Sequence, residues 1–246
     1  MQCRVLAVAN QKGGVGKTAT AVTLAAGLAA RGKRTLVIDL DPQANATGNL
    51  AVGQHTPGIA EVLQGETTLR EACSETGRSG LSLIAGGNRM ATWSLEEKCA
   101  CPWRTEHATE SFDFVILDCP PSISGPTILA LQESDELIIP VQSEYLALEG
   151  LSSLLRAVDG VRGATGALQI RYLITMFDRR NNLAGEVEAE LRAHFGKQVS
   201  RSVIPRSVRM AEAPGFRRTI FEHDEACSAA QAYAAFTEEV LAYGPQ

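Results

Sequence analysis

The sequence predicts an α/β fold built on a doubly wound, mostly parallel sheet flanked by helices. Apolar runs of strand length alternate with longer amphipathic segments along the 246 residues. The runs are continuously apolar, which is typical of parallel strands covered on both faces. The composition, 45% hydrophobic and 21% charged, is that of an ordinary globular protein. We therefore expect a single domain over residues 1–246, with its site at the carboxyl ends of the strands.

The expected strands are short, and Gly-rich or polar turns separate them from the helices. The strands are expected at Val5–Ala9, Thr35–Leu40, Leu81–Ala85, Phe114–Leu117 with Asp118, Leu137–Val141, Leu168–Thr175 and Ser202–Ile204. Apolar residues at three- and four-residue spacing predict helices at Thr18–Ala30, Glu144–Val158, Leu183–Phe195 and Cys227–Tyr243. The segment 86–111 follows neither pattern, and the sequence assigns it no structure.

Charge is unevenly distributed along the chain. The formal net charge is −5, but residues 162–222 hold eleven Lys or Arg and six acids, a net +5 against −10 elsewhere. Such asymmetry can create a basic face on an acidic protein. From charge alone, a set of solvated surface charges is the favoured interpretation.

The sequence shows no secretory signal pattern and no apolar run of membrane-spanning length. We therefore expect a cytoplasmic protein with reduced thiols. Cys99 and Cys101 form half of a metal-site pattern, but no second pair follows nearby, so two ordinary thiols are the favoured interpretation.

A glycine-rich loop follows the first expected strand and opens a helix. Residues 11–18 read QKGGVGKT. Glycines allow successive backbone N–H groups to face phosphate oxygens, and the helix adds its positive dipole end. Lys17 would reach the β- and γ-phosphates, while the Thr18 hydroxyl would bind Mg²⁺. The loop departs from the pattern G-x-x-x-x-G-K-[ST], because Gln11 replaces the first glycine and Lys12 adds a second lysine.

Carboxylates end two of the expected strands. Asp39 and Asp41 lie two residues apart at the end of one strand, which suits one carboxylate near Mg²⁺ and one that orients an attacking water. Asp118 ends an apolar strand, as in the Walker B arrangement, where the carboxylate holds Mg²⁺. We therefore expect Thr18, Asp39 and Asp118 around the metal.

These motifs together resemble the ParA/Soj branch of the ParA–MinD family, whose deviant Walker A loop has a lysine at each end. The loop here reads KGGVGKTAT, with Ala19 where the family commonly has Thr. The resemblance implies a P-loop NTPase fold and an ATPase that uses ATP and Mg²⁺ and is slow without a partner. It implies an ATP-bound homodimer in which Lys12 reaches the partner's nucleotide, and it makes Asp41 the residue that activates water. The expected nucleotide-binding residues of the loop are Gly13, Gly14, Val15, Gly16, Lys17, Thr18 and Ala19.

The resemblance continues into the basic third of the chain. Val203–Arg209 reads VIPRSVR, a segment that contributes to the adenine pocket in the family, so Pro205 and Ser207 are expected beside the base. ParA/Soj proteins bind double-stranded DNA without sequence preference, through arginines in this region. This implies a nucleoid-associated protein with a ParB-like or other cargo adaptor. The candidate DNA contacts are Arg179, Arg180, Arg206, Arg209, Arg217 and Arg218.

Three other functions stay open at this stage. A MinD-like regulator would carry a basic amphipathic helix at its end, whereas this chain ends in AAFTEEVLAYGPQ, so we expect no membrane binding. A metabolic P-loop enzyme, for example one that makes amides, would need a substrate pocket and no DNA affinity. A metal-cluster carrier would use paired cysteines. The sequence does not reveal whether the cargo is a chromosome, a plasmid or a protein assembly.

Overall fold

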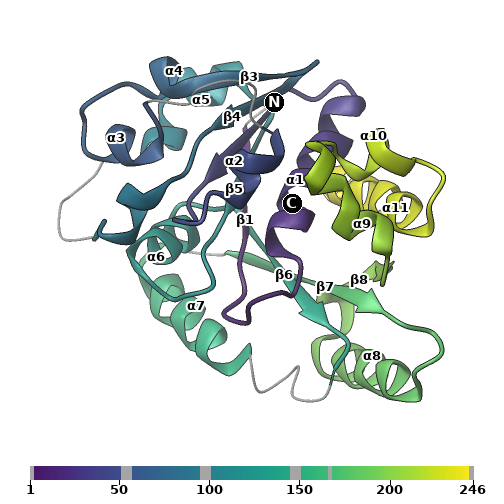
Figure 1. The fold of residues 1–246 in the computed structure, drawn as a ribbon. Helices are drawn as coiled ribbons and strands as arrows, with labels where there is room; N and C mark the ends of the chain where they lie inside the picture. Colours follow the sequence, from purple (N-terminus) through teal and green to yellow (C-terminus); the bar gives the residue numbers. More distant parts are fainter. Residues whose placement is uncertain (1–2, 51–56, 95–100, 145–150, 166–167, 244–246) are drawn as a thin grey trace.

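The fold is organised around one eight-stranded sheet that draws strands from both halves of the chain (Figure 1). The computed structural model describes residues 3–50, 57–94, 101–144, 151–165 and 168–243. The strand order is β3-β4-β2-β5-β1-β6-β7-β8, and every neighbouring pair is parallel except β3 and β4. The strands are β1 (Arg4–Val8), β2 (Thr35–Asp39), β3 (Cys73–Arg78), β4 (Leu81–Ile84), β5 (Phe114–Asp118), β6 (Glu136–Gln142), β7 (Gln169–Phe177) and β8 (Val199–Pro205).

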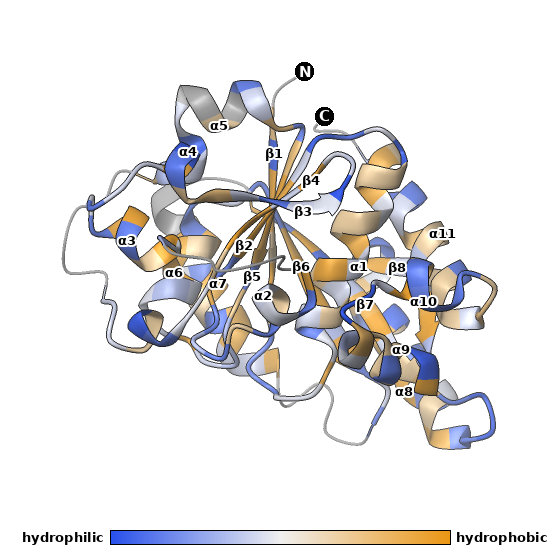
Figure 2. Ribbon diagram, turned by 45° about the horizontal axis from the view of Figure 1, so that its top comes forward, coloured by the Kyte–Doolittle hydropathy of each residue, from blue (hydrophilic) through white to orange (hydrophobic). Residues whose placement is uncertain are grey.

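Helices cover both faces of this sheet. One face packs against α1 (Lys17–Ala30), α2 (Asn45–Leu50) and α11 (Ser228–Ala242), next to the short α9 (Val208–Glu212) and α10 (Ile220–Asp224). The other face packs against α3 (Ile59–Leu63), α4 (Leu69–Ala72), α5 (Glu106–Ser111), α6 (Gly125–Gln132), α7 (Ser152–Thr165) and α8 (Asn182–Phe195). Figure 2 shows the apolar strands lying between these two helical layers.

The two helical layers explain why the strands are continuously apolar. In β1, Val5 and Ala7 belong to the core on one face, whereas Leu6 and Val8 belong to the core on the other. All of these side chains are fully buried. Since neighbouring side chains of a strand point to opposite faces, each position must be apolar.

The predicted doubly wound, mostly parallel sheet is confirmed, and every strand expected from the sequence is present with small shifts at its ends. The sequence missed β3, which reads CSETGR and pairs with β4 in antiparallel fashion at the edge of the sheet. Only one residue of β3, Thr76, is buried. An edge strand exposed in this way carries no apolar run to detect.

The predicted helix Glu144–Val158 matches the structure only in part. Residues 145–150 lie outside the described residues, Glu144 is not helical, and α7 begins at Ser152 and runs to Thr165. The short helices α2, α3, α4 and α6 were not predicted, because each is too brief to show helical periodicity.

In the described part of the irregular segment 86–111, two 3₁₀ turns lie at Asn88–Ala91 and Pro102–Arg104, and α5 follows them. Trp103 is fully buried within it. Cys99 lies outside the described residues, and in the described part of the chain no cluster of three or more His, Cys, Asp and Glu side chains could hold a metal. Nor is any helix in that part long and apolar enough to cross a membrane.

Candidate active site

The glycine-rich loop lies at the carboxyl end of β1, in the middle of the sheet. Gly14 and Gly16 have φ angles of 75° and 91°, in the left-handed region that glycine adopts without strain. A Cβ atom built on Gly13 or Gly14 would meet nothing within 4 Å, so there is open space beside the backbone at both glycines. Helix α1 begins at Lys17 directly after the loop, and its positive dipole end faces the same space.

Two buried hydrogen bonds fix the loop to the neighbouring strands. The Asn10 side chain donates to the Pro140 carbonyl of β6 at 2.8 Å, and the Thr175 hydroxyl of β7 donates to the Val15 carbonyl at 2.9 Å. Met176, the next residue of β7, has a φ of 53°, which is rare for a residue with a side chain. Its methyl group lies 4.0 Å from the position of a Cβ on Gly16. Contacts with β6 and β7 therefore hold the backbone of the loop in place without a bound nucleotide.

The two lysines of the loop have different surroundings. Lys17 is buried, and its ammonium donates to the Lys12 carbonyl at 3.1 Å. Burial lowers the pKa of Lys17, and the charges of Asp118 and Asp41 offset part of this shift. The Lys12 ammonium instead lies 3.3 Å from the carboxylate of Glu144, and this side chain is 41% exposed.

Asp118 is a fully buried carboxylate at the end of β5. It ends β5 beside Asp39 of β2, its direct partner in the strand register, and both residues are fully buried. Neither oxygen of Asp118 accepts a hydrogen bond of normal geometry from the described residues. Burial and then the charge of Asp39 raise the pKa of Asp118 well above its usual value, and the nearby Thr18 hydroxyl offsets part of this shift. A cation bound here would remove the cost of the unpaired charge.

Both carboxylate oxygens of Asp39 accept hydrogen bonds from the segment that follows it. One oxygen accepts from the Asp41 backbone N–H at 3.1 Å, and the other accepts from both the backbone N–H and the hydroxyl of Thr47, at 2.8 and 2.7 Å. Burial raises the pKa of Asp39 to about 6, although these hydrogen bonds oppose the shift. The Thr47 hydroxyl in turn accepts from the Gly86 backbone N–H at 2.9 Å. Asp39 thereby shapes the turn that carries Asp41.

The residues present fit Mg²⁺ held partly by phosphate. Mg²⁺ takes oxygen ligands and usually keeps waters and one or two carboxylates beside substrate phosphates. Thr18 and Asp118 supply a hydroxyl and an unpaired carboxylate at the loop. Asp39 directs its oxygens to Thr47 and Asp41, so its predicted role as a metal ligand stays a prediction.

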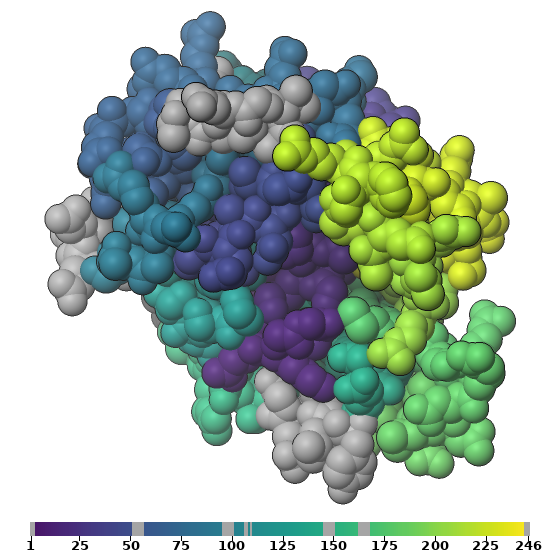
Figure 3. Space-filling view, viewed as in Figure 1, coloured from purple at the N-terminus to yellow at the C-terminus, as the bar shows by residue number. Residues whose placement is uncertain are grey.

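A cleft of about 450 Å³ extends from the loop. Figure 3 shows the purple atoms of the N-terminal part of the chain reaching the surface between the blue segment after β2 and the yellow-green C-terminal segment. The predicted loop residues Gly13, Gly14, Gly16, Lys17, Thr18 and Ala19 line the cleft, together with Asp41. Val15 is buried beneath the loop and does not line it.

The lining of the cleft also includes residues that the sequence did not single out. Neither Pro205 nor Ser207 lines it, and their predicted contact with the base stays untested. The wall is formed instead by residues a few positions further along the chain and by α2. The lining residues that the sequence did not single out include Gln43, Asn45, Asn49, Met210, Ala213, Pro214, Thr219 and Ile220. Ala213 and Pro214 lie in the segment AEAP (residues 211–214), shortly after the predicted adenine segment, and this proximity was a signal that could have found them.

Comparison with known proteins agrees with this geometry. A family model described as an AAA domain matches residues 3–170. The chain is 45% identical to the chromosome-partitioning ATPase Soj of Thermus thermophilus, over 97% of this chain and 96% of that protein. It is 40% identical to the chromosome partitioning protein ParA of Caulobacter vibrioides, over 97% and 94%. The chain belongs to the ParA family of partitioning ATPases.

A solved structure supports the nucleotide site of this ParA-family chain. Cobyrinic acid a,c-diamide synthase from Mycobacterium smegmatis, solved with an ATP analogue and magnesium, superposes with a TM-score of 0.80. The identity is 29%, and the match covers 97% of this chain and 94% of that one. The P-loop NTPase fold of this chain is therefore shared with a protein that was solved with an ATP analogue and magnesium.

The predicted DNA-contact arginines of the ParA-family chain fall into two groups. Arg180 pairs with Asp178 at 2.9 Å, and Arg209 pairs with Glu212 at 2.9 Å and with Asp224 at 3.5 Å. The remaining arginines are exposed, and no ion pair is found for their side chains within the described residues. These are Arg179, Arg206, Arg217 and Arg218. Arg218 also lines the cleft beside the glycine-rich loop.

Proposed function

We propose that this protein is an ATP-dependent dimerising ATPase that binds DNA without sequence preference and segregates or positions a cargo. A cargo-bound adaptor of ParB type would stimulate hydrolysis, and the protein would associate with the nucleoid. The named relatives that partition chromosomes support this proposal, because they match almost the whole chain.

The position of Lys12 is the observation that carries the proposal. Its ammonium lies outside the loop, in an exposed ion pair with Glu144. Exposed pairs of this kind contribute little, at most about 1 kcal/mol, so the side chain can leave Glu144 at small cost. A second protomer placed against the loop could therefore receive Lys12 at its own γ-phosphate, as an arginine finger is supplied in trans.

The roles of the other loop residues follow from their contacts. Lys17 is held inside the loop and would exchange the Lys12 carbonyl for β- and γ-phosphate oxygens. Asp41 lines the cleft and would orient the attacking water. Bound Mg²⁺ would neutralise charge on the phosphates, and Thr18 with Asp118 would hold it. Hydrolysis would be slow alone, because no Lys12 from a second copy is then placed at the γ-phosphate.

The exposed arginines would make the DNA contacts. Arg179, Arg206 and Arg217 are exposed cations that can reach phosphates, whereas Arg180 would first have to leave Asp178. Phosphate contacts give affinity without base readout and release counterions, so binding should weaken steeply with salt.

A filter-binding assay with arbitrary duplex DNA, run across a salt series with ATP, ADP or no nucleotide, tests the proposal. We expect affinity only with ATP, and replacement of Arg217 by Ala should weaken binding equally for all sequences. The slope of log affinity against log salt should become shallower by about 0.9 for each lost contact. Equal DNA affinity in all three nucleotide states would refute the partitioning function.

A second candidate function is amide synthesis, since the diamide synthase shares the fold at 29% identity. The partitioning relatives are more similar, at 40% and 45% identity, and are therefore favoured. ATP turnover that depended on an added carboxylic acid and an ammonia donor would favour the synthase instead.

A further inference from the structure

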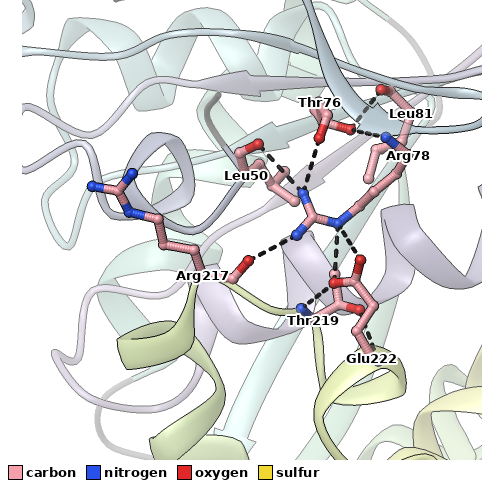
Figure 4. A network of polar contacts seen from close by, with 7 residues as sticks. All are labelled: Leu50, Thr76, Arg78, Leu81, Arg217, Thr219 and Glu222. Atoms are coloured by element: carbon pink, nitrogen blue, oxygen red, sulfur yellow. Dashed lines mark hydrogen bonds and ion pairs between the residues drawn. The ribbon is translucent and has the colours of Figure 1, made fainter. Parts of the chain in front are cut away.

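Arg78 stands on a bulged turn at the edge of the sheet. The register of β3 and β4 shifts between Glu75 and Arg78, and Gly77 has a φ of 72° that turns the chain outward. The buried Thr76 hydroxyl donates to the Leu81 carbonyl at 2.8 Å and fixes the turn. The guanidinium of Arg78 therefore projects toward the C-terminal segment from a hairpin that this hydrogen bond stabilises (Figure 4).

The first partners of Arg78 belong to the C-terminal wall of the cleft. Its Nε lies 2.9 and 3.0 Å from the two carboxylate oxygens of Glu222, and its Nη2 donates to the Arg217 carbonyl at 2.9 Å. Arg217 has a φ of 52°, a left-handed conformation that costs energy outside glycine. Figure 4 shows its side chain directed away from Arg78, so only its backbone is held.

Glu222 links Arg78 to Thr219, a residue of the cleft wall. Its carboxylate accepts from the Thr219 backbone N–H at 2.7 Å, and its own N–H donates to the Thr219 hydroxyl at 3.3 Å. Thr219 lines the nucleotide cleft, as do its neighbours Arg218 and Ile220. Arg78 therefore holds the chain on both sides of residues 218–220, through the Arg217 carbonyl on one side and the Glu222 carboxylate on the other.

Nη1 of Arg78 has two acceptors, the Thr76 carbonyl of the same hairpin at 3.3 Å and a carbonyl of the opposite wall (Figure 4). Its Nη1 donates to the carbonyl of Leu50, the last residue of α2, at 3.4 Å. Helix α2 carries Asn45 and Asn49, which line the other side of the cleft. One guanidinium therefore bridges segments that belong to the two walls of the cleft.

We propose that Arg78 is a positioning residue that fixes the separation of the two cleft walls and thereby the affinity for ATP. The planar fork of arginine can serve several acceptors at once, whereas lysine offers a single point charge. The inference rests on the nucleotide part of the proposed function, but not on dimerisation or DNA binding.

Isothermal titration of the full chain with Mg·ADP and with a slowly hydrolysed Mg·ATP analogue tests this role. We expect Arg78→Ala to weaken binding of both nucleotides about tenfold, the effect of one lost charge-assisted hydrogen bond. Arg78→Lys should recover part of the loss. In steady-state assays Arg78→Ala should raise KM for ATP and leave kcat nearly unchanged, since Lys17 and Asp41 stay in place.

Arg89 provides the matched control, because it makes an equally dense polar network with Glu61, Gln64 and Glu66, away from the nucleotide cleft. Arg89→Ala should leave nucleotide affinity unchanged. If Arg78→Ala fails to fold, Arg78→Lys and Glu222→Gln carry the test.

Three results would overturn the proposed role: wild-type affinity in both Arg78 variants, an equal loss in Arg89→Ala, or a fall in kcat without a rise in KM. A wild-type chain that binds neither nucleotide would instead contradict the proposed function.

Discussion

The ammonium of Lys17 donates a hydrogen bond to the backbone carbonyl of Lys12 at 3.1 Å, so the main chain of Lys12 holds the side chain of Lys17. The Lys12 side chain takes no part in this contact and pairs with Glu144 instead. The two lysines can therefore be separated by mutation, because a substitution at Lys12 keeps the carbonyl that Lys17 uses.

Replacing Lys12 by Ala should abolish the ATP-dependent dimer and leave nucleotide binding by the monomer nearly intact. Sedimentation velocity with and without Mg·ATP measures the first property, and titration calorimetry measures the second. Lys33→Ala is the matched control, since Lys33 follows the far end of α1. A dimer that persists in the Lys12 variant would show that this lysine does not act across an interface.

Asp118→Asn should stabilise the nucleotide-free protein and remove its stabilisation by Mg²⁺. The substitution removes a buried carboxylate that lies next to Asp39 and accepts no hydrogen bond of normal geometry from the described residues, and this removal is worth about 2 kcal/mol, or roughly 5 °C in Tm. Thermal melts with ATP, with and without Mg²⁺, provide the measurement. The exposed Asp159→Asn should change neither value. A lower Tm for nucleotide-free Asp118→Asn would mean that Asp118 already has a stabilising partner.

The free energy of unfolding of the nucleotide-free protein should fall as pH rises from about 4 to about 6. The folded-state pKa of Asp39 is raised to about 6, and that of Asp118 is raised as well, so the folded protein holds more protons than the unfolded chain in this window. The stability that protonation supplies is therefore present at low pH and is lost as pH rises through the folded pKa.

Urea denaturation at several pH values measures this dependence. Other carboxylates with lowered pKa values, such as Asp178, act in the opposite direction below this window, so the comparison is between wild type and Asp118→Asn. The variant should show a shallower decline, because it lacks the titrating carboxyl group of Asp118. Parallel curves for the two proteins would contradict the assignment.

Gly86→Ala should impair hydrolysis more than nucleotide binding. A Cβ on Gly86 would lie 2.6 Å from the Asp39 carbonyl oxygen and 2.9 Å from its carboxyl carbon, so Asp39 must shift. Since Asp39 holds the turn that carries Asp41, the shift should displace the water-orienting carboxylate. We expect a loss of about 1–3 kcal/mol in stability and at least a tenfold fall in kcat.

The neighbouring Gly87 supplies the control for this substitution. A Cβ on Gly87 would meet nothing within 4 Å, so Gly87→Ala should behave as wild type in the same melts and ATPase assays. Equal kcat values for the two alanine variants would show that the Asp39 contact does not govern the Asp41 turn.

The sequence by itself determined the sheet, the phosphate loop and the strand-end carboxylates. Buried parallel strands must be apolar at every position, and a loop that wraps phosphate needs glycine and lysine at fixed spacing, so both leave local patterns. The edge strand β3 left none, because it is exposed and polar.

The tertiary structure alone decided which residues complete the cleft. Asp39 and Asp118 face each other only because β2 and β5 are neighbours in the sheet. Arg78 reaches Glu222 from 144 positions away, and α2 meets the C-terminal segment behind the cleft. Contacts between elements so distant along the chain depend on how the strands are ordered and the helices packed, and that order is a property of the whole fold, which no local pattern of residues encodes.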